Sequence, residues 1–482
     1  MGHVVPVARS VGDDLSPVEP AYCTAYRMLS NALIRLSHSE AESWRGIATA
    51  AALVLTLCRR PSGFWGVPTN EEEVEWYFRG SPEFAFGDYD YGSFTITWYA
   101  LLAFQAIYGS CPSKFLDGVR SVFETLPSVD GAYGKLFAPG AKVDATQIVE
   151  SPRHTAFALL IRLRFLERYR PEEWIETVKW LLDARTEKRR GWSYTKDKSK
   201  PDEPFSTGAC IAALAYFLTV AGAKCDKNLI DEVVEALNFA FKRLLEIRRD
   251  ERSLWAGHLS NGEKDIPDSA KVIDLLQMPE VYAQLHKHVP GFSKQFGDLK
   301  MALRTRITPQ GASSRTDKEA SITNSATVNV LPLAFEIYSE TDTDREYLRS
   351  LCLNVFETLR SYGSRLRLES ADWALLTRGC ACVLKGSGQG PLSEADRAQI
   401  NDVCASVNKA SSFHFQTFRL AMSGMPTVSD GSILYLLSRG SKYRGRTILG
   451  LNRILLCWLP YARNYLTRAA LMKIFGIQKL GR

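Results

Sequence analysis

A motif of about 50 to 60 residues recurs along this 482-residue chain, and it constrains the fold more than any other feature. Each copy has a turn of glycine and an aromatic residue, then a polar cluster that opens an apolar, Ala/Leu-rich segment. The turns are Gly63–Gly66, Gly131–Gly134, Gly191–Tyr194, Leu254–Gly257, Pro309–Ala312 and Tyr362–Gly363. The polar openings are Gly92–Thr95, Ser151–Thr155, Phe205–Thr207, Pro267–Ser269, Ser321–Thr323 and Ser370–Asp372.

One polar residue in each opening marks the repeat. The markers Thr95, Thr155, Thr207, Ser269, Thr323 and Asp372 are 60, 52, 62, 54 and 49 residues apart. Ser, Thr and Asp oxygens accept hydrogen bonds from the free N–H groups that begin a helix, so each opening predicts a helix start. The segments that follow, such as 98–108 and 209–220, are apolar on nearly every face. They are therefore predicted to lie inside a larger helical assembly.

The segments between these apolar helices are amphipathic. In 171–183 the apolar residues Trp174, Val178, Leu181 and Leu182 have helical spacing behind a proline in the first turn. Each unit thus holds one buried and one half-exposed helix. We expect an all-α fold in which about six helical hairpins close into a double ring, an α/α toroid, with the buried helices as the inner wall.

The unit from Arg153 to Leu214 resembles the prenyltransferase/squalene-cyclase repeat. That resemblance implies the α/α toroid of terpenoid cyclases and protein prenyltransferase β subunits. It is strongest over this unit and extends, more weakly, from Trp44 to Leu384. The expected organisation is an N-terminal helical segment at 1–40, a toroid domain at 41–438 and a basic helical extension at 439–482.

Resemblance to class II terpene cyclases implies an acid that protonates an alkene or epoxide. The nearest match to their Asp-x-Asp-Asp motif is the segment that begins at Asp88, directly before an inner helix. By position Asp90 would be the acid and Asp88 its flanking carboxylate, with Tyr91 in place of the last Asp. The alternative is that both carboxylates cap the helix and stay ionised.

A carbocation route also needs aromatic faces, because ring quadrupoles stabilise cations without acting as bases. The candidates at or near the helix openings are Tyr89, Tyr91, Phe94, Trp98, Phe157, Trp192, Phe205 and Trp373. The alternative for each ring is packing between the inner and outer helices.

Parallel inner helices would gather their amino-terminal ends at one mouth of the ring. Arg153 and His154 open one such helix and can bind a diphosphate or orient a carboxylate. Asp268 and Asp372 hold the equivalent place in later repeats and would face the same mouth. The alternative for Arg153 and His154 is a helix start with an outward arginine.

No metal site is expected. None of the ten cysteines forms a C-x-x-C pair, and the Asp-x-Cys pair of the zinc prenyltransferases is missing. His286 and His288 are interpreted as a solvated turn, and the Lys188–Arg190 run as solvated loop charge. No cofactor is predicted, except that Mg²⁺ would accompany a diphosphate substrate.

Charge is concentrated at the carboxyl end. Residues 439–482 carry ten Lys/Arg and no Asp/Glu, while the whole chain has a net charge of +7. This extension is expected to dock on a membrane surface or an acidic protein partner. No motif for nucleic-acid binding accompanies the charge. Because 1–14 lacks an apolar signal core, we expect a cytoplasmic protein, peripheral at the membrane if the extension anchors it.

Two functions follow. The first is an isoprenoid-handling, terpene-cyclase-like protein with Asp90 as the general acid and a prenyl-type small molecule as substrate. The second is a non-catalytic toroid that binds a ligand or a protein partner through its cavity or rim. Enzymatic activity is left open between them.

Overall fold

The computed structural model describes part of the chain, which includes four consecutive repeats and one later helix. The described residues are 48–49, 52, 55–56, 59, 63–65, 92–125, 130–134, 150–166, 171–186, 190–221, 225–248, 255, 265–308, 311–312, 351, 370–386 and 398. For 125, 171–173, 265–268, 311–312, 370–373 and 383–386 the backbone alone is described. The predicted segments 1–40 and 439–482 lie outside the described residues.

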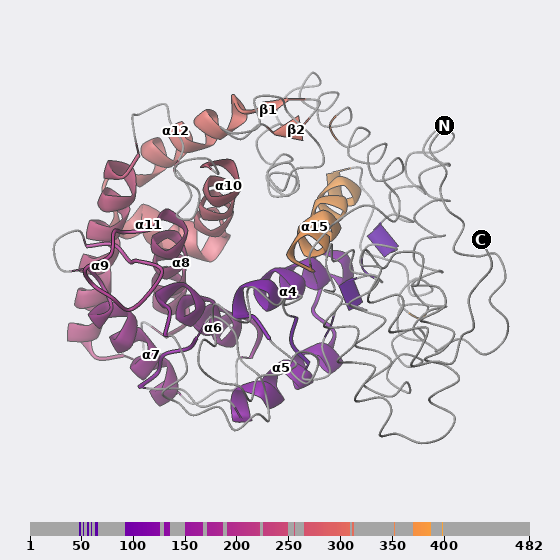
Figure 1. The fold of residues 1–482 in the computed structure, drawn as a ribbon, viewed down its shortest axis with the longest axis horizontal. Helices are drawn as coiled ribbons and strands as arrows, with labels where there is room; N and C mark the ends of the chain where they lie inside the picture. The colour runs from indigo at the N-terminus through magenta and orange to yellow at the C-terminus, as the bar shows by residue number, and fades with distance from the viewer. Residues whose placement is uncertain are drawn as a thin grey trace, which may run out of the picture.

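The described helices form a double ring, and the predicted α/α toroid is confirmed (Figure 1). The inner helices are α4 (Phe94–Tyr108), α6 (Pro152–Phe165), α8 (Pro204–Ala221), α10 (Asp265–Leu276) and α15 (Ser370–Gly386). Each packs on the next around the ring, from α15 to α4, α6, α8 and α10. An ion pair between Asp274 of α10 and Arg378 of α15 joins the two ends of this series.

The second layer surrounds the first (Figure 1). Its helices are α5 (Ser113–Thr125), α7 (Pro171–Asp183), α9 (Lys227–Glu246), α11 (Pro279–His288) and α12 (Phe292–Arg304). Helices α7, α9 and α11 pack on α8, and α12 packs on α10. A two-residue antiparallel pair, β1 (Ile307–Thr308) with β2 (Gly311–Ala312), follows α12.

Burial separates the two layers as the sequence predicts. All of α8 is buried except Thr219 and Val220 at its end. In α7 the buried residues are Trp174, Val178 and Leu181 with their neighbours on one face. Among the described residues α8 alone is long and apolar enough to cross a membrane, but 89% of it is buried inside the protein, as a core helix would be.

Hydrogen bonds explain why the Gly/aromatic turn and the polar opening recur together. The backbone N–H of Trp192 donates to Thr207 Oγ1 at 3.1 Å, and the hydroxyl donates back to the Trp192 carbonyl at 3.3 Å. The indole Nε1–H donates to the Leu181 carbonyl of α7 at 2.8 Å. The tryptophan therefore ties the end of an outer helix to the start of the next inner helix. We call this arrangement the turn latch.

The turn latch recurs in the other described repeats. The pairs of turn residue and hydroxyl residue are Trp65 with Thr97, Tyr133 with Thr155, and Trp255 with Ser269. The indoles of Trp65 and Trp255 donate to the carbonyls of Leu55 and Leu244. The choice of Thr95 as the first marker is wrong by two residues, because the hydroxyl of Thr97 makes the latch.

The capping predicted at the helix starts is also corrected. Ser93 and Ser151 occupy the N-cap positions of α4 and α6, but neither side chain caps its helix. The Ser151 hydroxyl instead donates to the Tyr194 carbonyl at 2.8 Å, which ties α6 to the next turn. At α8 the N-cap residue is Glu203, whose carboxylate accepts from the Ser206 N–H at 2.9 Å. The opening of α6 thus contacts the next turn through Ser151, whereas Glu203 accepts from its own helix.

Candidate functional site

The amino-terminal ends of α4, α6, α8 and α10 meet, as predicted for parallel inner helices, and they form the candidate site. Side-chain contacts join the four ends in sequence. Thr95 of α4 contacts His154 of α6, Arg153 of α6 contacts Phe205 of α8, and Lys271 of α10 contacts the same ring. We call this group of helix ends the mouth.

Arg153 is the central cation of the mouth. Its guanidinium carbon lies 4.4 Å from the ring centre of Tyr194 and 4.9 Å from that of Phe205. Its Nη1 lies 3.6 Å from Glu203 Oε1. The two groups form an ion pair, but this distance is too long for a hydrogen bond. Its Nε–H is buried and has no hydrogen-bond partner in the described part of the chain. Arg153 therefore has unused donor capacity in a largely buried place.

Lys271 places a second cation at the same ring. Its Nζ lies 5.2 Å from the ring centre of Phe205, and no ion pair is found for it within the described residues. The side chain is half-buried. Two cations thus lie within about 5 Å of the centre of one aromatic ring, which gathers positive charge at the start of α8.

Glu203 is the carboxylate that the mouth provides to these cations. It is 2% exposed and accepts hydrogen bonds from both the backbone N–H and the hydroxyl of Ser206. One oxygen is therefore held by the start of α8, while the other faces Arg153. Next to it, burial raises the pKa of the Cys210 thiol well above its ordinary value, with the negative charge of Glu203 adding to the effect. The thiol is thus neutral and donates to the Pro152 carbonyl.

His154 links the mouth to the first described repeat. Its Nδ1 lies 3.2 Å from Thr95 Oγ1, and its ring lies edge-on to Tyr194 with centres 6.2 Å apart. The side chain is 4% exposed. His154 therefore holds α4, α6 and the turn after α7 together at the edge of the site.

Three aromatic rings, Phe205, Phe157 and Trp98, form a row that extends from the mouth along the inner helices. We call this row the aromatic file. Phe205 contacts Phe157 at 5.7 Å between ring centres, and Phe157 contacts Trp98 at 6.4 Å. All three rings are at most 2% exposed, so they pack against one another. The Trp98 Nε1–H is buried without a hydrogen-bond partner in the described part of the chain. A ligand that used these rings would have to separate them.

The predicted site residues fall into three groups. The structure brings together Arg153, His154, Phe157 and Trp98 at or behind the mouth. Trp192 forms a turn latch instead, with its hydrogen bonds to Thr207 and to the Leu181 carbonyl.

The remaining predicted residues have no described side chains. Asp88, Asp90 and Tyr91 lie outside the described residues, whereas Asp268, Asp372 and Trp373 lie in α10 and α15 with backbone alone described. Their catalytic or ligand roles stay predictions. Within the described residues no group of three His, Cys, Asp or Glu side chains could hold a metal ion.

Two charged residues of the mouth were not predicted. Glu203 lies four residues before the latch residue Thr207, and Lys271 lies two residues after the latch residue Ser269. Aligning the repeats on the latch hydroxyl would have placed Glu203 beside Ser151 and Lys271 beside Phe157. The markers Thr155, Thr207 and Ser269 already give this alignment, but neither equivalent residue is charged, so the repeat alone does not single out Glu203 or Lys271.

The chain was compared with known proteins. No protein-family model matches it, and no curated protein matches its sequence. Among solved structures it is similar to the cellobiose 2-epimerase from Bacillus thermoamylovorans B4167, at 10% identity and a TM-score of 0.41, covering 57% of this chain and 77% of that one. It is also similar to a sugar epimerase from a ruminal bacterium, at 12% identity and a TM-score of 0.40, covering 61% and 88%. A similarity of this degree says nothing of substrate or reaction.

Proposed function

We propose that this protein is a toroid that binds an anionic ligand at the mouth. The observation that carries the proposal is the convergence of Arg153 and Lys271 on Phe205, at 4.9 and 5.2 Å from the ring centre. Glu203 supplies one negative charge to these two cations. An uncompensated positive charge is costly where burial excludes water, so a bound anion would stabilise the site.

The buried Nε–H of Arg153 supports the same proposal. It has no acceptor in the described part of the chain, and guanidinium groups bind carboxylates and phosphates through two parallel N–H bonds. The amino-terminal ends of the inner helices add positive potential at this place. A phosphate, diphosphate or carboxylate group is the chemistry that fits.

The aromatic file suggests the other half of the ligand. Phe205, Phe157 and Trp98 lead from the charged mouth into an apolar interior. A ligand with an anionic head and an apolar chain would place the head between the cations and the chain among the rings. Prenyl diphosphates belong to this class, and Mg²⁺ would then arrive with the diphosphate.

Calorimetric titration tests the proposal. Farnesyl diphosphate, farnesol and inorganic pyrophosphate would each be titrated into the wild type, Arg153→Gln, Lys271→Met and, as a matched control, Lys294→Met on the exposed face of α12. We expect farnesyl diphosphate to bind most tightly, and each mouth variant to weaken it by about tenfold or more. Equal affinity in Lys271→Met and the wild type would refute the proposal, because Lys271 makes no described ion pair whose loss could unfold the protein.

Acid-initiated cyclisation is the catalytic form of this proposal. The aromatic file favours it, since ring faces stabilise carbocations. Asp90 would donate the proton and Asp88 would flank it. The test is incubation of the wild type and Asp90→Asn with prenyl diphosphates and squalene. A cyclised product that is absent in Asp90→Asn supports catalysis; no product from the wild type leaves ligand binding as the function.

The basic extension 439–482 is proposed to dock on an anionic membrane or an acidic protein. Its support is the charge of ten Lys/Arg without a carboxylate. Co-sedimentation with phosphatidylserine vesicles, with and without 439–482, tests the membrane form. Equal pelleting of the two chains would contradict anchoring by this segment.

A further inference from the structure

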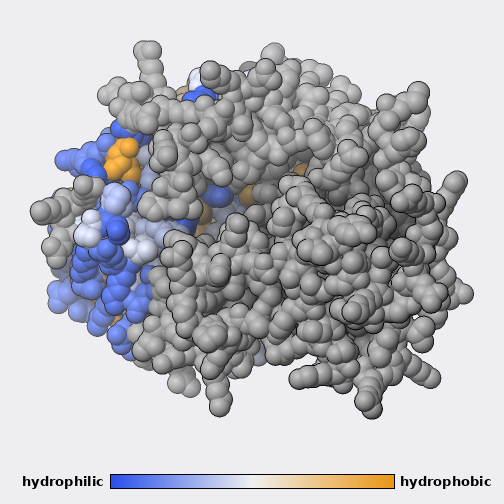
Figure 2. All heavy atoms as spheres, viewed as in Figure 1, coloured by the Kyte–Doolittle hydropathy of each residue, from blue (hydrophilic) through white to orange (hydrophobic). Residues whose placement is uncertain are grey.

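A concave site lies on the outer layer, between α7 and α9. It is a cleft of about 580 Å³, within the range of protein binding sites. We call it the outer cleft, and its lining residues are Lys179, Leu182, Asp183, Arg185, Thr186, Arg190, Lys198, Glu232, Glu235 and Phe239. None of them belongs to the mouth. Hydrophilic side chains cover this side of the ring (Figure 2).

The segment that borders the outer cleft is strongly basic. Residues 185–200 contain seven Lys/Arg and two Asp/Glu. From the sequence, these residues are interpreted as solvated loop charge. In the structure, Arg185, Arg190 and Lys198 line one cleft. Such a concentration of one sign attracts ligands of the opposite sign.

Two of the lining cations are paired and two are not. Lys198 Nζ lies 3.2 Å from Asp183 Oδ1, and Arg185 pairs with Glu232 at 3.7 Å. Lys179 and Arg190 have no ion pair within the described residues. These two cations are therefore available to a ligand.

Arg190 is held in an unusual conformation. Its backbone φ is +60°, in the left-handed region that L-residues other than Asn and Asp rarely adopt. Its guanidinium carbon lies 3.7 Å from the ring centre of Phe239, so one face of the cation stacks on α9. Stacking leaves the N–H edge of a guanidinium free to bind a carboxylate through two bonds. Backbone strain that presents a cation in a cleft is typical of binding sites.

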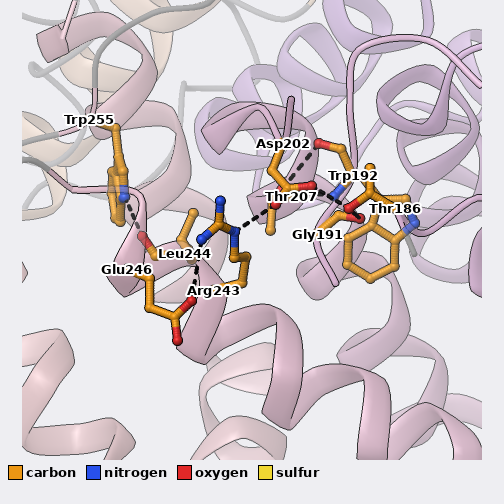
Figure 3. Close-up of polar contacts among 9 residues, drawn as sticks. All are labelled: Thr186, Gly191, Trp192, Asp202, Thr207, Arg243, Leu244, Glu246 and Trp255. Atoms are coloured by element: carbon orange, nitrogen blue, oxygen red, sulfur yellow. Dashed lines mark hydrogen bonds and ion pairs between the residues drawn. The ribbon is translucent and has the colours of Figure 1, made fainter. Parts of the chain in front are cut away.

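The support beneath Arg190 is rigid. Its N–H donates to the Thr186 carbonyl at 2.9 Å, and the Thr186 hydroxyl donates to the buried carboxylate of Asp202 at 2.5 Å. Arg243 of α9 donates to the same carboxylate at 2.6 Å (Figure 3). Gly191 has to be glycine, since a Cβ there would lie 2.9 Å from Asp202 Cγ. The backbone at Arg190 is therefore tied through Thr186 and Asp202 to α9, so this cation is held in position before a ligand binds.

We propose that the outer cleft binds an acidic peptide segment of a partner protein. The carboxylates Asp183, Glu232 and Glu235 share the lining with four cations, and the lining includes the half-buried ring of Phe239. Asp183 and Glu232 are already paired with Lys198 and Arg185, so the two unpaired cations remain as separate points of contact. A peptide can place separate carboxylates on Lys179 and Arg190 and an apolar side chain beside Phe239.

Fluorescence anisotropy with a labelled oligo-glutamate peptide tests this proposal, with oligo-glutamine of equal length as the uncharged control. The key variant is Arg190→Gly, which removes the guanidinium while relieving the left-handed backbone, so loss of folding is not expected. Lys179→Glu is the second variant. Lys294→Glu, an exposed residue of α12 outside the cleft, is the matched control for charge.

We expect oligo-glutamate to bind, its affinity to fall with added salt, and both cleft variants to weaken it by about tenfold or more. Lys294→Glu should bind as the wild type does, which separates a loss at the cleft from a general effect of changing one surface charge. Unchanged binding in Arg190→Gly would overturn the proposal and assign the peptide to another basic segment, such as 439–482. Tighter binding of a labelled single-stranded oligonucleotide at the same residues would overturn it as well.

Discussion

Arg378 of α15 and Asp274 of α10 form a two-pronged ion pair that links the two ends of the described series of inner helices. Arg378 Nη1 lies 2.5 Å from Asp274 Oδ2, and Nη2 lies 2.8 Å from Oδ1, although 104 residues separate them. The Asp274 side chain is 6% exposed and that of Arg378 is 18% exposed. Burial alone would lower the pKa of Arg378, but the paired carboxylate more than offsets burial and raises it. Both ends of the described helix series therefore depend on one side-chain contact.

The first prediction concerns this pair. Asp274→Asn should lower the free energy of unfolding by about 3–5 kcal/mol, because it leaves a largely buried guanidinium without its counter-charge. Urea denaturation measures the change. The exposed pair of Arg120 with Asp117 on α5 is the control, and Asp117→Asn should cost at most about 1 kcal/mol.

The apolar double variant separates charge from packing. Asp274→Leu combined with Arg378→Met should recover most of the stability lost in Asp274→Asn, since neither charge is then buried alone. A double variant as unstable as the sum of its single variants would show that the two residues do not interact.

The second prediction concerns the turn latch. Thr207→Val removes the oxygen that accepts the Trp192 N–H inside the protein and should cost about 1–3 kcal/mol of unfolding free energy. Thr207→Ser keeps that oxygen, as Ser269 does naturally in the next repeat, and should cost less than about 1 kcal/mol. Equal losses in the two variants would mean that the methyl group, not the hydroxyl, holds the turn.

The third prediction is a pH effect at His288. Burial, with a contribution from Lys287, lowers the pKa of this imidazole below its ordinary value of 6.5. Below pH 6.5 the unfolded chain binds a proton that the folded protein binds less well, so stability falls as the pH falls. Urea denaturation from pH 7 to pH 5 should show a shallower loss in His288→Gln than in the wild type. Identical slopes would contradict the lowered pKa.

The fourth prediction concerns Cys111. Burial raises the pKa of its thiol to about 12, against a smaller opposing effect of Arg59. At pH 8 the reactive thiolate is then about 10⁻⁴ of the population, against about a quarter for a free cysteine. Iodoacetamide followed by peptide mass spectrometry should label Cys111 far more slowly in the native protein than in guanidinium chloride. Similar labelling rates in the two states would refute the shift.

Local chemistry made much of the fold predictable. In each latch the turn residue and the hydroxyl residue are 14 to 32 residues apart. Pairs such as Trp192 with Thr207 and Trp255 with Ser269 therefore recur along the sequence as a repeat that can be recognised. The period alone could not say whether Thr95 or Thr97 carries the first latch, because both hydroxyls fit it. The hydrogen bonds between Trp65 and the Thr97 hydroxyl decide this, because the Thr95 hydroxyl contacts His154 instead.

The site was predictable only in part, for a physical reason. Arg153 and His154 stand out because a charged pair begins an apolar helix. Lys271 carries no local signal, since its importance comes from the ring curvature that sets α10 beside Phe205. The pairing of Asp274 with Arg378 is hidden in the same way, because contacts across a closed ring have no fixed spacing along the chain.

Hydrogen exchange tests the central proposal, ligand binding at the mouth, most directly. Exchange would be followed by mass spectrometry with and without farnesyl diphosphate, in peptides that cover 151–157, 203–210 and, for comparison, 179–190. We predict that exchange slows by about tenfold or more in 151–157 and 203–210 and is unchanged in 179–190. Unchanged exchange at both mouth peptides under saturating ligand, or slowing confined to 179–190, would contradict it.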